Sequence, residues 1–377
     1  MRQRTKAFFL TVVLCAFSLT LWAQATVKVG VLLPLKEQSA RGMTFIEFYR
    51  GLLMAVDQVK QEGTNIDLYA FDCGTSEASM RQTLANPQLA SVNVIFGPAD
   101  AVQVASLSEY CKQHRIRMVL PFNTPCSQVH TNPWIYQVGV AQELLYPGIS
   151  TLVMKDLQNS NFVFYHSGEK DERGESFSNH LMQVLRLSNM QTTTLAAGGD
   201  EYAYDCAFNQ FRQNVVISDN RSLSSLNKML AGIKDYQARY PQYKIVLFGY
   251  PEWLTYAQTM IRDYYQFDTR IFSAYYRNPL SGRVVKFEQR YRDNFGSQSR
   301  LSYPRAESLG YDLGYYFMHG LATLGPDRFE TMQGTLEQQP LQHTFRFERL
   351  GTENGGFANI NVQLVHYTTN NTIQIVR

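Results

Sequence analysis

The sequence predicts an α/β fold made of two doubly wound units, in which each parallel sheet carries helices on both faces. Short apolar runs alternate with longer segments whose apolar residues recur at helical spacing, and the connections between them are short. The alternation is interrupted by a loop-rich stretch at 123–139 and then resumes. A chain of 377 residues is also too long for one compact core and suits two domains.

The first unit opens with VKVGVLLPL at 27–35, a continuous apolar run typical of a strand that is buried on both faces. The segments that follow alternate between the two periodicities. Strands are predicted at 66–74, 92–96 and 115–122, and helices at 45–63, 76–88 and 99–114. Strands and helices in strict alternation imply a parallel sheet, because the helices carry the chain back to the same edge.

The second unit repeats this pattern after the loop-rich stretch. Helices are predicted at 141–157, 177–189, 204–212, 223–241 and 251–265, and strands at 161–167, 191–196, 214–219, 243–249 and 269–276. From Arg277 the pattern becomes helical, at 282–296 and 306–325. Alternating apolar and polar residues at 345–350 and 357–376 then predict a terminal strand pair.

The first 25 residues have the features of a secretory signal peptide. MRQRTK is basic, the next 16 residues are apolar, and AQA at 23–25 supplies the small residues of a cleavage site. We therefore expect export to the periplasm with cleavage, and a retained N-terminal membrane anchor is the alternative. Removing Arg2, Arg4 and Lys6 leaves 32 basic residues against 32 acidic ones. A neutral mature chain does not favour nucleic acid as a partner.

Four cysteines would remain after cleavage: Cys73, Cys111, Cys126 and Cys206. Four cysteines allow three pairings, and the sequence does not choose among them. Two of the four follow predicted strands and one lies late in a predicted helix. We expect free thiols that are mostly buried.

The stretch VNVIFGPADAVQ places a Gly-Pro bend at 97–98, where a strand ends and a helix begins. Free backbone N–H groups at such a point attract an anion, and Ala99, Asp100 and Ala101 could donate them. The alternative is a plain turn in which Asp100 caps the helix. A phosphate loop fits poorly, because neither a second Gly nor a Lys-Ser/Thr pair follows.

A second candidate is YPEWLTY at 250–256, which follows a predicted strand. Glu252 could accept a ligand amine there, with Trp253 stacked on the ligand. In the alternative, Glu252 only serves the helix dipole and Trp253 packs in the core. Arg277 could grip a carboxylate or form a surface ion pair, and the charged run at 168–176 is interpreted as a solvated loop.

Catalytic and metal-binding patterns are not found. The sequence contains no GxSxG, HExxH, CxxC or GxGxxG motif, and its seven histidines are scattered without metal-ligand spacing. We expect no cofactor and no enzymatic activity.

Four stretches resemble type I periplasmic binding proteins of the Leu/Ile/Val-binding kind. They are VKVGVLLPL with FYRGLLMAVDQV, then VIFGPADAVQVASLSEYCKQHRIRMVLPF, AESLGYDLGYYFMHGLATLG with its Gly-Tyr-Asp, and FRFERLGTENGGFANINVQLVHY. The resemblance covers nearly all of the mature chain. It implies two lobes joined by three crossing segments, which would comprise 27–139 with 278–340 and 140–277 with 341–377.

The resemblance also implies a ligand held between the lobes. The residues expected in that cleft are Ala99, Asp100, Asn123, Thr124, Tyr250, Glu252 and Trp253. Amino-acid binders of this family usually place a Ser or Thr hydroxyl soon after the Gly-Pro, where this chain has Ala99, Asp100 and Ala101. Asn123 and Thr124 are possible substitutes.

Two functions follow as expectations. The first is a periplasmic solute-binding protein that captures an amino acid or a similar small ligand for a membrane permease of the ABC type. The alternative is a regulator of cell-wall synthesis that has the same fold and acts through contacts with a synthase. A hydrolase is the least favoured reading.

Overall fold

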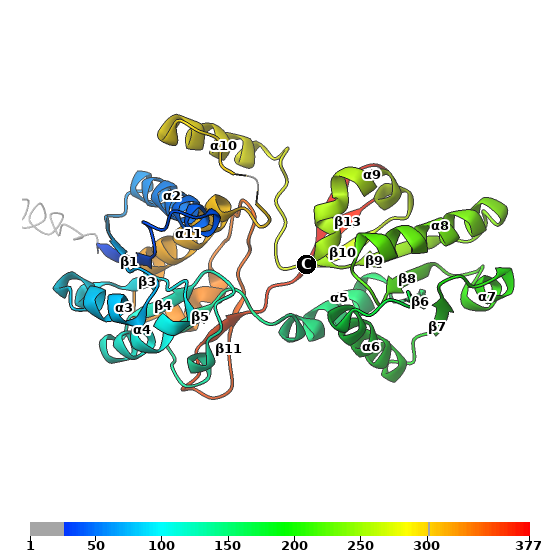
Figure 1. Ribbon diagram of the computed structural model, residues 1–377, viewed down its shortest axis with the longest axis horizontal. Helices are drawn as coiled ribbons and strands as arrows, with labels where there is room; N and C mark the ends of the chain where they lie inside the picture. The colour runs from blue at the N-terminus through cyan, green and yellow to red at the C-terminus, as the bar shows by residue number, and fades with distance from the viewer. Residues whose placement is uncertain (1–25, 301) are drawn as a thin grey trace, which may run out of the picture.

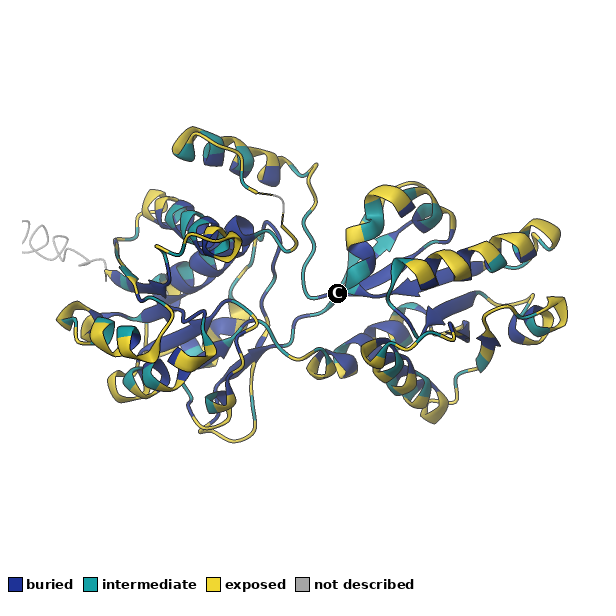
Figure 2. Cartoon of the chain, viewed as in Figure 1, coloured by how far each residue is buried: buried dark blue, intermediate teal, exposed yellow. Residues whose placement is uncertain are grey.

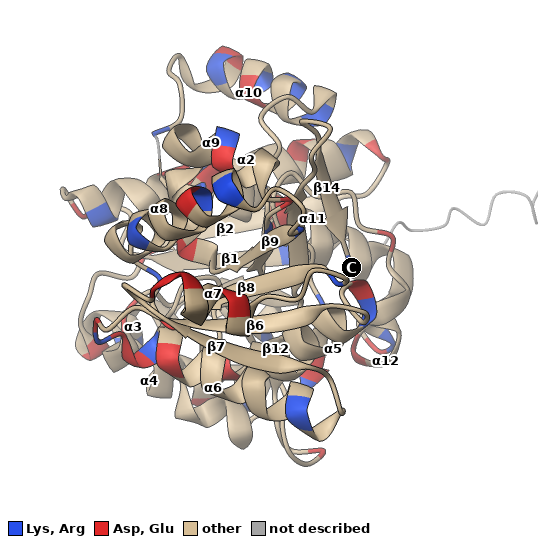
Figure 3. Ribbon diagram, turned by 90° about the vertical axis from the view of Figure 1, so that its right-hand side faces the viewer, with Lys and Arg blue, Asp and Glu red and all other residues tan. Residues whose placement is uncertain are grey.

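The computed structural model describes residues 26–300 and 302–377, so the signal peptide expected at 1–25 lies outside the described residues. The described chain forms two α/β lobes, each with one seven-stranded sheet (Figure 1). Buried residues fill the interior of each lobe and exposed residues cover the outer helices (Figure 2). Basic and acidic residues are dispersed over these helices (Figure 3).

The first sheet has the order β11-β12-β5-β4-β3-β1-β2. Its strands are β1 (Val27–Leu33), β2 (Ile66–Asp72), β3 (Val94–Phe96), β4 (Arg117–Leu120), β5 (Ile135–Gln137), β11 (Phe347–Arg349) and β12 (Phe357–Asn359). Only β11 runs antiparallel to its neighbour. The helices of this lobe are α2 (Ala40–Gln61), α3 (Glu77–Leu84), α4 (Ala101–His114), α10 (Gly282–Phe295), α11 (Ala306–Leu324) and α12 (Phe329–Met332).

The second sheet has the order β14-β13-β10-β9-β8-β6-β7. Its strands are β6 (Asn161–His166), β7 (Thr192–Ala196), β8 (Asn214–Ser218), β9 (Ile245–Gly249), β10 (Arg270–Ser273), β13 (Gln363–Tyr367) and β14 (Ile373–Val376). The helices are α5 (Tyr146–Asp156), α6 (Glu172–Leu187), α7 (Glu201–Ala207), α8 (Leu223–Arg239) and α9 (Ala257–Gln266). Short 3-10 turns are η1 (Pro87–Ser91), η2 (Ser127–His130), η3 (Gln142–Leu145), η4 (Pro251–Tyr256) and η5 (Gln333–Thr335).

The first five strands of each lobe share one topology, which confirms the predicted pair of doubly wound units, but β12 runs parallel to β5 whereas β13 runs antiparallel to β10. In each, the first strand of the lobe lies between the second and the third, so the chain changes direction beside β1 and beside β6. Ligands of such sheets bind beyond the carboxyl ends of the strands at this switch point. The chain leaves the first sheet after β5 and after β12, and it leaves the second sheet after β10. The carboxyl ends of the parallel strands therefore point toward the other lobe (Figure 1).

The terminal strands differ from the expected lobe boundary. Residues 345–359 were expected in the second lobe, but β12 pairs with β5 and β11 pairs with β12. The reason is aromatic packing, because the Phe357 ring stacks on the Tyr136 ring at a centroid distance of 4.7 Å. The last crossing therefore falls between β12 and β13.

Two long helices of the first lobe lie in direct contact. A Cβ atom added at Gly51 of α2 would lie 2.0 Å from the backbone oxygen of Glu307 in α11, and one at Gly310 would lie 2.0 Å from that of Phe48. Glycine at both positions lets α2 and α11 pack this closely.

The four cysteines are free thiols, as expected. Cys73, Cys111 and Cys126 are buried, whereas Cys206 is exposed. Among the described residues, no helix is long and apolar enough to cross a membrane.

Candidate functional site

An ion pair spans the switch point of the first lobe. Arg41, in the first turn of α2, donates from Nη2 to Oδ1 of Asp100 at 2.7 Å and to the backbone oxygen of Ala99 at 3.3 Å. Its guanidinium lies over the Phe45 ring, 5.0 Å from the centroid. The contact joins the helix after β1 to the loop after β3, which are the two edges of the crevice.

Asp100 occupies the N-cap position of α4, but its side chain makes no capping hydrogen bond. The carboxylate turns to Arg41 instead, so it leaves the first N–H groups of α4 open at the crevice. The pairing also neutralises the charge that would oppose a bound anion. Asp100 thus has a different role from the helix cap considered for the turn.

The bend itself requires glycine. Gly97 has a φ of +133°, and a Cβ atom there would lie 2.1 Å from the backbone oxygen of Leu32. The strand end can approach β1 this closely only without a side chain.

The remaining first-lobe candidates lie beside this pair. Thr124 is buried and donates from Oγ1 to the Ala99 backbone oxygen at 3.1 Å. Asn123 precedes it with an exposed side chain. The structure therefore brings Ala99, Asp100 and Thr124 into one hydrogen-bonded group.

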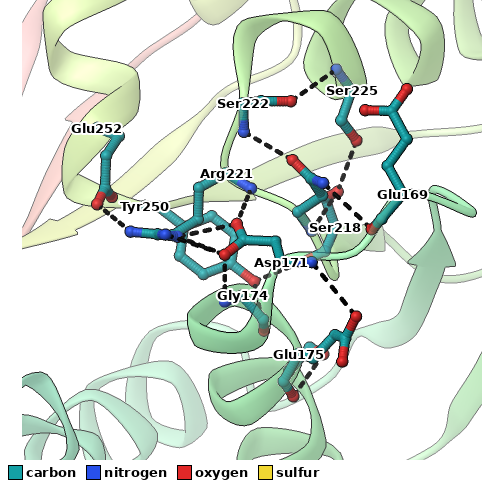
Figure 4. Close-up of polar contacts among 12 residues, drawn as sticks. Glu169, Asp171, Gly174, Glu175, Ser218, Arg221, Ser222, Ser225, Tyr250 and Glu252 are labelled. Atoms are coloured by element: carbon teal, nitrogen blue, oxygen red, sulfur yellow. Dashed lines mark hydrogen bonds and ion pairs between the residues drawn. The ribbon is translucent and has the colours of Figure 1, made fainter.

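A second ion pair spans the switch point of the other lobe. Asp171 caps α6, and Arg221 follows β8. Nε of Arg221 donates to Oδ2 of Asp171 at 2.9 Å, and Nη2 donates to Oδ1 at 2.9 Å (Figure 4). Burial alone would raise the pKa of Asp171. Hydrogen bonds from Arg221 and Gly174 lower it by more than burial raises it, so the pKa lies below its usual value. The carboxylate stays charged at neutral pH.

Glu252 completes this cluster. Nη1 of Arg221 donates to Oε1 of Glu252 (Figure 4). Oε2 of Glu252 is buried and has no hydrogen-bond partner among the described residues, although 38% of the side chain as a whole is exposed. The carboxylate therefore keeps one unused acceptor, which faces a ligand only after the side chain turns toward the crevice.

Tyr250 and Trp253 do not reach the crevice surface, because both are fully buried. The Tyr250 hydroxyl donates to the backbone oxygens of Ser218 at 2.5 Å and Gly174 at 3.1 Å. The Trp253 ring stacks on the Tyr264 ring at 6.3 Å. These are contacts of the second-lobe core, which was the alternative reading of Trp253.

Each lobe carries an open hollow at its carboxyl edge. The second-lobe hollow has a volume of about 390 Å³ and is lined by Glu169, Lys170, Asp171, Asn220, Arg221, Ser222, Glu252 and Tyr256. The first-lobe hollow has a volume of about 780 Å³ and is lined by Leu35, Lys36, Glu37, Gln38, Ser39, Ala40, Met43, Ile46 and Arg300. Both hollows adjoin the ion pairs, since Glu37 lies 3.8 Å from Arg41.

Arg277 forms an ion pair, but not at the surface, because only 8% of its side chain is exposed. It donates to Oε1 of Glu288 at 2.6 Å and to Oγ of Ser308 at 3.2 Å. These contacts brace the crossing segment after β10 against the first lobe.

The same crossing segment pairs with a strand-like stretch of the first lobe. The N–H of Tyr276 donates to the Gln342 backbone oxygen at 3.0 Å, and Tyr275 and His343 form an antiparallel bridge. On the other side, Nδ2 of Asn361 donates to the Ala274 backbone oxygen at 3.3 Å. Two of the three crossings are therefore in contact.

Asp312, in the Gly-Tyr-Asp of α11, holds this stretch in place. Its carboxylate accepts hydrogen bonds from the N–H groups of Leu341 at 2.7 Å, Gln342 at 2.9 Å and His343 at 2.7 Å. Burial raises the pKa of Asp312 to about 7, although the three N–H groups lower it.

The sequence indicated Asp100, Thr124 and Glu252, but not the arginines that pair with them. The available signal was the position of each arginine in the sequence, because Arg41 lies soon after β1 and Arg221 soon after β8, at the carboxyl ends of these strands. Asp171 was hidden in the charged run at 168–176, which contains the first turn of α6 and is only partly a solvated loop. No group of three or more His, Cys, Asp or Glu that could hold a metal occurs among the described residues.

Comparison with known proteins places the fold. No family model and no curated protein matches the chain. Solved structures do match, and they include a protein assigned to branched-chain amino acid ABC transport from Rhodospirillum rubrum, with a TM-score of 0.61 and 13% identity over 93% of this chain and 100% of that one.

A second protein assigned to that transport, from Chromobacterium violaceum, has a TM-score of 0.56 and 16% identity over 90% of this chain and 99% of its own. A branched-chain amino acid ABC transporter periplasmic ligand-binding protein from Burkholderia xenovorans has a TM-score of 0.51 and 11% identity, over 93% and 94% of the two chains. At these identities the likeness establishes the two-lobed fold implied by the sequence resemblance.

Proposed function

We propose that this chain is an exported solute-binding protein that captures an amino acid or a similar zwitterion between its lobes, for a membrane permease of the ABC type. The observation that carries this proposal is the opposite charge of the two facing edges. In the first lobe, Arg41 pairs with Asp100, and neither Lys36 nor Arg300 has a side-chain ion pair among the described residues. In the second lobe, Glu169 pairs with Lys228, and the two carboxylates of Asp171 and Glu252 share the single cation of Arg221.

This polarity orients the ligand. Its carboxylate meets Arg41 and the open N–H groups of α4, in place of the hydroxyl that is missing after the Gly-Pro. Its ammonium meets the partly exposed carboxylate of Glu252, whose unpaired Oε2 turns toward the ligand on binding. Each ligand charge then lies against an opposite protein charge.

Closure would follow from hinge motion at the three crossings. A ligand shifts the equilibrium toward the closed state only by its extra contacts in that state. A zwitterion bridges the two edges and makes such contacts, whereas either edge alone binds only half of it. Export to the periplasm, from the signal peptide, would place the closed complex where a permease collects it.

A thermal-shift screen of residues 26–377 against the proteinogenic amino acids and against longer amino acids that carry a second carboxylate tests the proposal. A ligand at 100 times its dissociation constant stabilises the folded state by about 2.7 kcal/mol. We expect at least one amino acid to raise the melting temperature, with calorimetry giving a single site. A screen in which none does would overturn it.

One observation favours a second candidate. In each lobe an ion pair already spans the crevice, so its charged groups have protein partners without a ligand. This is the arrangement expected of a surface that binds no small ligand. In that case the chain would regulate cell-wall synthesis through protein contacts. The same screen separates the two, because the regulator would show no shift.

A further inference from the structure

The first-lobe hollow is larger than a free amino acid needs. Its volume is about 780 Å³, and it opens widely to solvent. It is formed by the loop after β1, the first two turns of α2 and Arg300, so it continues from the Arg41 side of the crevice. A ligand seated there has room for a long substituent.

Two cations of the hollow have no acidic partner. Among the described residues, neither Lys36 nor Arg300 forms an ion pair through its side chain, and both are exposed. Glu37 also lines the hollow, but its carboxylate accepts from Ser39 Oγ at 2.7 Å and faces Arg41 at 3.8 Å. The charge left unpaired in the hollow is therefore positive.

The backbone of Arg300 is fixed although its side chain is free. Its N–H donates to the buried carboxylate of Glu47, at 2.9 Å to Oε1 and 3.1 Å to Oε2. Its backbone oxygen accepts from Nη1 of Arg305 at 2.9 Å. These bonds fix the backbone at Arg300 before any ligand arrives, so that only the side chain remains to be ordered on binding.

The hollow also has an aliphatic part, next to the polar side chains of Gln38 and Ser39. Leu35, Met43 and Ile46 contribute its aliphatic surface, and Met43 is exposed there. Aliphatic surface flanked by unpaired cations matches a hydrocarbon chain that ends in an anion.

We propose that this hollow is a subsite for an anionic extension of the ligand, so that the preferred ligand is an amino acid whose long aliphatic side chain ends in a carboxylate. The inference rests on the proposed function, since the amino-acid group occupies the crevice. The side chain lies on Leu35, Met43 and Ile46, and its terminal carboxylate pairs with Lys36 and Arg300.

Two probes of equal length test the subsite. 2-Aminosuberate and 2-aminooctanoate have the same eight-carbon chain and differ in the terminal carboxylate. We expect the mature wild-type chain to bind 2-aminosuberate at least tenfold more tightly by calorimetry. In the Lys36→Met, Arg300→Met double variant we expect the preference to fall to about twofold or less. Both residues are exposed, so thermal unfolding without ligand should not change.

Lys60→Met is the matched control, because Lys60 is an exposed lysine at the other end of α2. It should keep the wild-type preference. Equal affinities of the wild type for the two probes, or a double variant that keeps the preference, would overturn the subsite while leaving the proposed function intact. If neither probe nor any free amino acid binds, the proposed function itself fails.

Discussion

Arg41 and Asp100 form the same contact in the first lobe that Asp171 and Arg221 form in the second, with the order of acid and base along the chain reversed. In each lobe the pair joins the helix after the first strand to the loop after the third. The Arg41–Asp100 distance is 2.7 Å and the Arg221–Asp171 distance is 2.9 Å. The reversed order places the arginine on the helix after the first strand in one lobe and on the loop after the third strand in the other.

The first prediction concerns Arg41. Arg41→Met removes the cation that meets the ligand carboxylate and also leaves the Asp100 charge uncompensated beside it. We expect the ligand identified by the screen to bind more weakly by about 1–3 kcal/mol, measured by calorimetry. In Arg41→Met with Asp100→Asn, part of this loss should return, because the repelling charge is gone. If the double variant binds more weakly than the single one, Asp100 itself contacts the ligand.

The second prediction concerns Glu252. Glu252→Gln keeps the shape of the side chain but removes the charge that meets the ligand ammonium. The ligand should bind more weakly by about 1–3 kcal/mol. Asp171 still holds Arg221, so the fold should not change. Glu172→Gln serves as the control, because Glu172 pairs only with Lys170 and 80% of its side chain is exposed. Equal affinities of the wild type and Glu252→Gln would remove Glu252 from the site.

The elements of the fold could be predicted because hydrophobic periodicity is a local property of the chain. The sheet to which β11 and β12 belong could not be predicted. The alternation at 345–359 fits an edge of either sheet, and packing of Phe357 on Tyr136, far away in sequence, decides between them. Local pattern specifies a strand, but only long-range contacts specify its partner.

The candidate site could be predicted only in part, because its residues are marked by local pattern but their pairings are set by long-range contacts. Asp100, Thr124 and Glu252 lie where predicted strands end, which a single sequence reveals. The partner of Asp100 is 59 residues away and that of Asp171 is 50 residues away, so the sequence does not indicate either pairing. The position of Trp253 after a strand fits either a contact with a ligand or packing in the core. Only its burial in the structure shows that it packs in the core.

The third prediction follows from the burial of Tyr250. Tyr250→Phe leaves the backbone oxygens of Ser218 and Gly174 without this donor in a closed interior. We expect the free energy of unfolding to fall by about 1–3 kcal/mol, measured by urea denaturation. Ligand affinity well below the melting temperature should not change, because the hydroxyl points into the lobe. A large loss of affinity with unchanged stability would instead place Tyr250 in the ligand site.

The last prediction concerns pH and Asp312. Burial raises its folded-state pKa from 3.8 to about 7, so the folded state binds more protons than the unfolded state between these values. Its contribution to the free energy of unfolding is therefore greatest below about pH 4 and is lost as the pH rises to about 7. Asp312→Asn cannot titrate. The difference in unfolding free energy, wild type minus Asp312→Asn, should accordingly decrease between pH 5 and 7 and level off above that range.

Asp57→Asn, at an exposed position of α2, should show no such trend. A difference for Asp312→Asn that is constant from pH 5 to 8 would mean that Asp312 stays ionised throughout. The three N–H groups of Leu341, Gln342 and His343 would then outweigh its burial, and the support that it gives the crossing segment would not depend on pH.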